Sequence, residues 1–317
     1  MPETTAARRV WVPFGRSAKD LLPGLVADVF TGVDIEAPGG VPDSIDEVEY
    51  FVMPYSFANS HPELMARMPR LQVVQTLTAG YEHVVSYLPD GVTLCNARGL
   101  HDASTAELAL TLTLSALRGI PRYVRQQSRN DWSPAYKDDD AVVDDALADK
   151  TVLIVGYGSI GSAIERRLAG FEVDVLRVAR TPRDGVHAIS DIGTLLPRAD
   201  VVIVVVPATD ETRGLVDEAF LARMKDGALL VNVARGVVVR TDALQAECAS
   251  GRLRAAMDVT DPEPLPPDHP LWQTPNVLVT PHVGGASTAF LPRALKLIDE
   301  QLRRFAEGEE LANVVVG

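Results

Sequence analysis

Short apolar runs alternate with segments of helical spacing between about residue 150 and residue 283. The apolar runs predict strands at 151–155, 173–178, 201–206, 228–233, 255–259 and 277–280. The segments between them predict helices at 160–169, 192–196, 218–224 and 241–250. Strands that are apolar throughout and separated by helices are typical of a parallel sheet covered on both faces.

The first 95 residues repeat this pattern more weakly, with strands expected at 10–14, 49–53, 71–77 and 93–96. A long helix is expected from about Thr105 to Arg118, with Ser104 and Glu107 as a capping box and a possible continuation past Pro121. An amphipathic helix at 294–307 follows the last strand of the second unit. We expect it to return to the first unit, which would make that unit discontinuous.

Composition and charge narrow the class of protein. A chain of 317 residues that is 46% hydrophobic and 23% charged predicts about two packed domains. Its net charge of −13 argues against nucleic acid and membrane surfaces as partners. The 2 cysteines are too few for a disulfide framework, and no metal-ligand spacing is visible, so we expect no metal. The N-terminus lacks the apolar segment of a signal peptide, which predicts a cytoplasmic protein.

The segment Gly156-Tyr157-Gly158-Ser159-Ile160-Gly161 follows a predicted strand and opens a predicted helix. In that context the G-x-G-x-x-G pattern indicates a dinucleotide site, because the glycines allow a tight turn, close approach of the pyrophosphate and close helix–strand packing. The N-terminus of the helix then offers N–H groups to the phosphates.

The end of the second strand of this unit discriminates between NAD and NADP. A carboxylate that binds the ribose 2′-hydroxyl is expected near Ala179, but the sequence there continues with Arg180, Thr181 and Arg183. These residues suit a 2′-phosphate, so we prefer NADP over NAD as the cofactor. The alternative is that both arginines are ordinary solvated loop residues.

Three residues that suit carbonyl reduction lie at or soon after predicted strand ends: Arg235, Glu263 and His282. Ligands of open α/β sheets bind at that edge. A histidine can give a proton to the developing alkoxide, and a neighbouring carboxylate orients the ring and favours its protonated form. A guanidinium can bind a substrate carboxylate with two hydrogen bonds.

Taken with the segments 75–80, 96–99 and 281–282, the chain resembles the D-isomer-specific 2-hydroxyacid dehydrogenase family, in its glyoxylate/hydroxypyruvate reductase-like branch. The resemblance implies a Rossmann-type doubly wound domain at 100–285. It also implies a smaller, discontinuous flavodoxin-like α/β substrate domain at 1–99 and 286–317, and a homodimer. Leu108, Leu112 and Leu117 of the long helix are candidates for the dimer interface, unless they are buried against their own domain.

The resemblance also implies roles for matched positions. Arg235 would bind the substrate carboxylate and polarise the carbonyl, His282 would be the acid/base, and Glu263 its partner. Backbone N–H groups of Thr78, Ala79 and Gly80 would hold the carboxylate, and Asp258 would lie near the nicotinamide amide. Further cofactor contacts are implied at Val206, Pro207, Thr212, Val233, Ala234 and Gly284.

We therefore expect a D-stereospecific reductase that moves a hydride between NAD(P)H and C2 of a small 2-oxo or 2-hydroxy acid. The segment 54–57, with Tyr55 and Phe57, is expected in the pocket wall and favours an apolar or modest substrate side chain, although both rings suit a domain core equally well. One alternative is an NAD(H)-sensing corepressor-like protein without turnover. Another is different chemistry on the same scaffold, such as phosphite oxidation.

Overall fold

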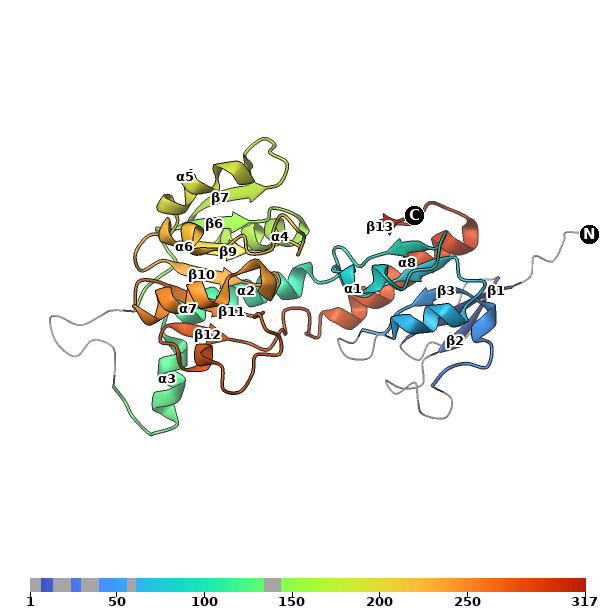
Figure 1. The fold of residues 1–317 in the computed structure, drawn as a ribbon, viewed down its shortest axis with the longest axis horizontal. Coiled ribbons are helices and arrows are strands. Elements are labelled where there is room, and N and C mark those ends of the chain that lie inside the picture. The colour runs from blue at the N-terminus through green and yellow to red at the C-terminus, as the bar shows by residue number, and fades with distance from the viewer. Residues whose placement is uncertain (1–6, 14–23, 30–39, 56–60, 134–143) are drawn as a thin grey trace, which may run out of the picture. The chain divides into compact units, whose positions relative to one another are not determined.

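A computed structural model describes residues 7–13, 24–29, 40–55, 61–133 and 144–317. The chain forms two compact units (Figure 1). Unit 1 comprises Met1–His101 and Thr288–Gly317, and unit 2 comprises Asp102–Ser287. The boundaries that we expected from the sequence lie two residues from these positions.

Unit 2 contains a seven-stranded sheet in the order β12-β11-β10-β9-β6-β7-β8, with every pair of neighbours parallel (Figure 1). Its strands are β6 (Thr151–Val155), β7 (Asp174–Ala179), β8 (His187–Ala188), β9 (Val201–Val204), β10 (Leu229–Asn232), β11 (Arg254–Met257) and β12 (Val277–Val279). In chain order this is 3-2-1-4-5-6-7, which extends the classic dinucleotide-binding order by one strand. The prediction of a doubly wound parallel sheet is confirmed.

Helices cover both faces of this sheet. They are α2 (Asp102–Leu117), α3 (Ile120–Gln127), α4 (Ser159–Leu168), α5 (Ile192–Leu195), α6 (Glu218–Ala222) and α7 (Thr241–Ala249), with short 3-10 helices at Ile189–Asp191, Leu196–Arg198, Gly236–Val238 and Pro270–Gln273. Strand residues such as Leu153 and Val202 pack in one buried cluster with α5, α6 and α7. Their neighbours Ile154 and Ile203 pack in another with α2 and α4. Apolar side chains on both faces explain why these strands read as continuous apolar runs.

Three expectations for the long helix are wrong. Leu112 and Leu117 are buried in the core of their own unit and Leu108 packs against it, because this side of α2 lies on the sheet. The capping box is absent because the helix begins at Asp102, two residues before Ser104. The Ser104 hydroxyl instead shares a hydrogen bond of 2.6 Å with Ser287. Gly119, with φ of 62°, precedes the separate helix α3, so α2 does not continue past Pro121.

Unit 1 contains a six-stranded sheet in the order β13-β5-β4-β3-β1-β2. Its elements are β1 (Arg8–Val12), β2 (Leu25–Val29), β3 (Val48–Val52), β4 (Val73–Gln75), β5 (Thr93–Cys95), β13 (Val314–Val316), α1 (Glu82–Val85), α8 (Phe290–Glu307) and the 3-10 helices Ile45–Glu47 and Pro62–Arg67. The order 2-1-3-4-5 of the parallel strands is that of flavodoxin, as expected, and β13 adds an antiparallel edge.

Helix α8 completes the core of unit 1. Ile298, Leu302 and Phe305 are buried with Val10 and other strand residues of the same unit. A buried hydrogen bond of 2.8 Å from the Gln301 amide to Gln75 adds a polar link to β4. The smaller unit is therefore built from two separate parts of the chain.

In the part of the chain that the structure describes, no helix has the length and apolar character needed to cross a membrane. Within the same residues, no group of three or more His, Cys, Asp or Glu side chains is arranged to hold a metal ion.

Candidate active site

The glycine loop follows β6 and needs two of its glycines for internal packing. Gly156 has φ of 109°, and a Cβ atom there would lie 2.6 Å from the carbonyl oxygen of Val205. A Cβ atom on Gly161 would lie 2.3 Å from the carbonyl oxygen of Gly156. Any side chain at these positions would push the loop away from β9 or from α4.

Gly158 has a different reason to lack a side chain. A Cβ atom there would meet nothing within 4 Å, so the open space on this side of the loop is not filled by protein. The backbone at Ser159, Ile160 and Gly161 forms the first turn of α4, whose N–H groups and dipole favour an anion. The Ser159 hydroxyl bonds the Asp102 carboxylate. The loop therefore fits a dinucleotide pyrophosphate.

The end of β7 carries positive charge and no carboxylate at Ala179. Arg180 and Thr181 are exposed, and within the described residues the Arg180 side chain makes no hydrogen bond or ion pair. A hydrogen bond from Thr209, with a smaller contribution from the charge of Arg180, lowers the pKa of Glu211. Arg183 donates a hydrogen bond of 2.5 Å to the carbonyl oxygen of Tyr157 in the glycine loop.

The loop after β9 contains three of the expected cofactor residues. Val206 is half-buried, Pro207 is exposed, and the Thr212 hydroxyl donates to the Pro207 carbonyl oxygen at 2.6 Å. The same hydroxyl accepts the N–H of Thr209 at 2.8 Å. The structure thus shows a loop-shaping role for the Thr212 hydroxyl.

Arg235 follows β10 in a turn that buried Asn232 fixes. The Asn232 side chain accepts the N–H of Ala234 at 3.0 Å and donates to the Arg235 carbonyl oxygen at 3.2 Å. The Arg235 guanidinium donates to the Ala234 carbonyl oxygen at 2.7 Å and stays half-buried. A Cβ atom on Gly236 would overlap the carbonyl oxygen of Thr260, 1.8 Å away, so this turn packs directly on the chain after β11. Our sequence reasoning missed Asn232, although an Asn two residues before a loop Ala is a recognisable turn signal.

Asp258 lies at the end of β11 and holds the turn after β12. Its carboxylate is buried and accepts hydrogen bonds from the Thr280 hydroxyl at 2.6 Å, from the N–H of Val283 at 2.9 Å and from the N–H of Gly284 at 2.8 Å. Its carbonyl oxygen accepts the N–H of His282 at 2.8 Å. His282 adopts the left-handed φ of 51°, which this set of bonds stabilises.

The His282 imidazole and the Glu263 carboxylate are joined by a hydrogen bond between Nδ1 and Oε1. The side chains are 21% and 38% exposed, so the pair is open to a small molecule. With Nδ1–H donated to Glu263, Nε2 is the nitrogen that can exchange a proton with a ligand. Arg235, Glu263 and His282 follow β10, β11 and β12, which are neighbours in the sheet. Val233 and Ala234 are buried beside them.

In unit 1, the loop Thr78-Ala79-Gly80 follows β4 and directs its carbonyl groups inward. The Thr78 carbonyl oxygen accepts the N–H of Ala97 at 2.9 Å, and that of Ala79 accepts the Asn96 amide at 2.8 Å. The Gly80 carbonyl oxygen accepts the Thr78 hydroxyl at 2.6 Å. The three backbone N–H groups have no acceptor among the described residues, so they can bind an anion.

Tyr55 belongs to an aromatic cluster of unit 1. Its ring centroid lies 4.3 Å from that of Phe290 and 5.3 Å from that of His101. Tyr55 is half-buried, so one part packs in the domain core and another part stays accessible. Ser56 and Phe57, expected in the same pocket wall, lie outside the described residues.

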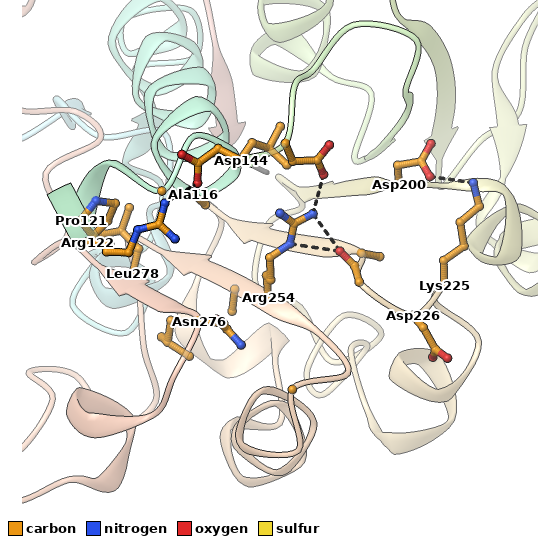
Figure 2. Close-up of a pocket in the computed structure, with 18 of the residues that line it drawn as sticks. Ala116, Pro121, Arg122, Asp144, Asp200, Lys225, Asp226, Arg254, Asn276 and Leu278 are labelled. Atoms are coloured by element: carbon orange, nitrogen blue, oxygen red, sulfur yellow. Dashed lines mark hydrogen bonds and ion pairs between the residues drawn. The ribbon is translucent and has the colours of Figure 1, made fainter. Parts of the chain in front are cut away.

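A cavity of about 640 Å³ lies at the amino ends of the strands of unit 2, and none of the predicted site residues lines it (Figure 2). Several of its charged groups form ion pairs: Lys225 pairs with Asp200 at 2.8 Å (Figure 2), and Arg254 pairs with Asp145 at 3.0 Å. Since ligands of such sheets bind at the carboxyl ends of the strands, we place the active site at the other edge.

Comparisons with known proteins identify the family of this chain. Residues 110–284, more than half of the chain, match the sequence family described as the NAD binding domain of D-isomer specific 2-hydroxyacid dehydrogenases. The chain is 33% identical over 262 residues to a glyoxylate reductase of Thermofilum pendens, covering 78% of this chain and 75% of the relative. It is 35% identical over 229 residues to a glyoxylate reductase/hydroxypyruvate reductase of Mus musculus, covering 68% of each.

Solved structures share the whole fold. A D-isomer specific 2-hydroxyacid dehydrogenase of Xanthobacter autotrophicus in complex with NADPH superposes with a TM-score of 0.77 at 30% identity, covering 98% of both chains. An NADPH-dependent glyoxylate/hydroxypyruvate reductase of Sinorhizobium meliloti in complex with NADP and sulfate has a TM-score of 0.78 at 27% identity, covering 97% of this chain and 98% of the other. The present chain therefore belongs to the D-isomer specific 2-hydroxyacid dehydrogenase family.

Proposed function

We propose that this protein is an NAD(P)H-dependent reductase of small 2-oxo acids that forms the D-2-hydroxy acid. The observation that carries the proposal is the His282–Glu263 pair. It lies at the carboxyl edge of the sheet that also carries the glycine loop and Arg235. The relatives from Thermofilum pendens and Mus musculus are reductases of glyoxylate and of glyoxylate or hydroxypyruvate, which favours this function over the corepressor and phosphite alternatives.

The reaction divides between proton transfer and charge stabilisation. The reduced nicotinamide, when bound, supplies the hydride to C2 of the substrate. His282 gives a proton from Nε2 to the carbonyl oxygen, and Glu263 holds the ring in the required tautomer through Nδ1. Arg235 binds the substrate carboxylate and stabilises the negative charge that develops on the carbonyl oxygen.

Other residues position the two ligands. We assign the N–H groups of Thr78, Ala79 and Gly80 to the substrate carboxylate. The glycine loop, residues 156–161, and the loop of Val206, Pro207 and Thr212 are assigned to the cofactor, as are Val233, Ala234, Asp258 and Gly284. For Asp258 the contacts of its carboxylate favour an indirect role, because they hold the turn that carries His282.

We further propose that NADPH is the preferred cofactor. Arg180 and Thr181 follow the second strand of the sheet, whose end is the usual ribose site of dinucleotide-binding folds, and no carboxylate is present at Ala179 to bind a free 2′-hydroxyl. Two similar solved structures hold NADP or NADPH. Equal affinity for NADH and NADPH would support the alternative that both arginines are solvated loop residues.

The substrate class follows from the accessible part of Tyr55 and from the relatives. The aromatic rings of Tyr55 and Phe290 favour glyoxylate, hydroxypyruvate or a larger 2-oxo acid with an apolar side chain. We also propose a homodimer. Ile120 and Val124 of α3, which are 46% and 58% exposed, are a better candidate surface than the buried leucines of α2. A cytoplasmic location stays a prediction from the sequence.

The decisive experiment is a paired assay of NADPH and NADH oxidation with glyoxylate, hydroxypyruvate, pyruvate and phenylpyruvate. We expect turnover with at least one acid and the D-hydroxy acid as the only product by chiral chromatography. A protein that binds NADPH but turns over none of these acids would instead fit the corepressor-like sensor.

A further inference from the structure

The two arginines that follow β7 are held differently. Arg180 has no hydrogen-bond or ion-pair partner among the described residues. Arg183 donates to the Tyr157 carbonyl oxygen at 2.5 Å, and its guanidinium carbon lies 5.4 Å from the centre of the Tyr157 ring. The Arg183 head group is therefore attached to the second residue of the glycine loop.

Tyr157 is itself fixed from two sides. Its hydroxyl donates to the Glu165 carboxylate on α4. Arg177 on β7 binds the same carboxylate through its Nε, 2.9 Å and 2.8 Å from the two oxygens, and its guanidinium carbon lies 5.8 Å from the tyrosine ring. The hydrogen bond with Arg177 lowers the pKa of Glu165, so this carboxylate stays ionised at neutral pH. One ring thus links the glycine loop, α4 and β7.

This arrangement favours a preorganised anion site. A guanidinium group has five N–H donors, and the Tyr157 carbonyl oxygen uses one Nη2 donor of Arg183. Contact with an aromatic ring attracts the cation and limits the rotamers of an otherwise exposed side chain. Because ordering a long side chain costs binding free energy, an arginine that is already ordered binds a phosphate more tightly.

We propose that Tyr157 is a positioning residue for the 2′-phosphate of NADPH: its ring and its carbonyl oxygen hold the Arg183 guanidinium at the adenosine end of the site. The inference rests on the proposed preference for NADPH. It assigns a specificity role to a position that the G-x-G-x-x-G pattern leaves open, and it makes Arg183 a preorganised partner of the unrestrained Arg180.

Binding of adenosine 2′,5′-bisphosphate and of AMP, measured by titration calorimetry, isolates the 2′-phosphate from the nicotinamide and from turnover. We expect the wild-type protein to prefer the bisphosphate. Tyr157→Leu keeps the carbonyl oxygen but removes the ring, and it should weaken bisphosphate binding about threefold to fivefold with AMP unchanged. Tyr157→Phe keeps the ring and should restore the preference.

A double-mutant cycle tests whether Tyr157 acts through Arg183. In an Arg183→Gln background, Tyr157→Leu should add no further loss of bisphosphate affinity. Tyr123→Leu is a matched control, since Tyr123 forms a similar cluster with Arg122, 4.7 Å from its ring, and with Asp144. This control should leave both affinities unchanged. Melting temperatures of all variants show whether each one is folded.

The possible results separate the two proposals. If the wild-type protein binds both nucleotides equally, the preference for NADPH and the role of Tyr157 are both wrong. The preference for NADPH is supported if the wild-type protein prefers the bisphosphate and Arg180→Ala removes that preference. In that case only the positioning role is wrong if Tyr157→Leu leaves the preference intact, or if its loss of affinity adds fully to that of Arg183→Gln. If Tyr157→Leu lowers the affinity for both the bisphosphate and AMP, the cycle with Arg183→Gln shows whether the loss of bisphosphate affinity depends on Arg183.

Discussion

His282 and Glu263 share a side-chain hydrogen bond although they are separated by 19 positions and follow different strands. The bond forms because β11 and β12 are adjacent and parallel, so the segments that leave them start from the same edge of the sheet. The buried carboxylate of Asp258 then fixes the turn that directs the imidazole. The proposed proton transfer by His282 therefore depends on two strand ends rather than on a local sequence motif.

We predict that His282→Ala abolishes turnover while NADPH affinity stays within about twofold, because the imidazole supplies the proton and not the cofactor site. Glu263→Gln should lower kcat about 100-fold, since the ring loses its charged partner. Stopped-flow kinetics and fluorescence titration measure the two effects. Glu63→Gln, which alters the comparable His61–Glu63 pair at 3.0 Å in unit 1, should leave both unchanged. Loss of NADPH binding in His282→Ala would contradict the proposed role.

Arg235→Lys should reduce kcat/KM for the 2-oxo acid about 100-fold to 1,000-fold, because an ammonium group cannot donate two parallel hydrogen bonds to a carboxylate. The melting temperature should change little, since among the described residues the half-buried guanidinium makes one hydrogen bond, to Ala234. Steady-state kinetics with the best substrate provides the measurement. Near-normal kinetics in the lysine variant would mean that another group binds the carboxylate.

Asp258→Asn should lower both kcat and stability, because an amide offers a weaker acceptor to the N–H groups of Val283 and Gly284. We expect a loss of about 1–3 kcal/mol in the free energy of unfolding. Asp217→Ala is the control: it removes the N-cap of α6, which accepts the N–H of Phe220, and should cost about 1 kcal/mol without a change in kcat. Urea unfolding and kinetics on both variants separate positioning of His282 from general stability.

Both thiols should be unreactive in the folded protein. Burial raises the pKa of Cys95 to about 11 and that of Cys248 to about 12, which disfavours the reactive thiolate. Labelling with a thiol reagent at pH 8 should therefore reach both cysteines only after unfolding in urea. Since both pKa values are raised in the folded state, their contribution to stability is present at neutral pH and is lost as the pH rises towards these values. Rapid labelling of the native protein would contradict the burial.

If α3 carries the dimer contact, Val124→Arg should convert a dimer into monomers, because it places a charge on an apolar surface. Light scattering after size-exclusion chromatography measures the mass. Val85→Arg, at a position in unit 1 that is 44% exposed, is the control and should leave the mass unchanged. A monomeric wild-type protein would remove the proposed dimer.

Continuous apolar runs predicted the central strands of both sheets, since burial on both faces leaves few polar positions in them. The edge strands β2, β8 and β13 were missed. Strand β8 has only two residues, and β13 pairs antiparallel with β5, which lies far from it in the sequence. The start of α2 was misplaced because Ser104 and Glu107 imitate a cap while their actual partners are Ser287 and Arg167.

Residue types and strand ends were enough to propose Arg235, Glu263 and His282, because together at one edge of a parallel sheet they suit carbonyl reduction. The contacts of Asp258 and the attachment of Arg183 to Tyr157 were not predictable, because they join segments whose spacing depends on the twist and register of the sheet. Sequence position gave Arg180 and Arg183 equal roles, whereas the structure distinguishes them.

The return of α8 to unit 1 has a consequence for biosynthesis. Ile298, Leu302 and Phe305 fill the core beside strands that are translated earlier, and all of unit 2 is translated in between. Unit 2 can therefore fold while its neighbour still exposes apolar strands, and those strands must wait for α8. Slow elongation over the codons of α8 should increase aggregation of this protein more than slow elongation within the segment that encodes unit 2.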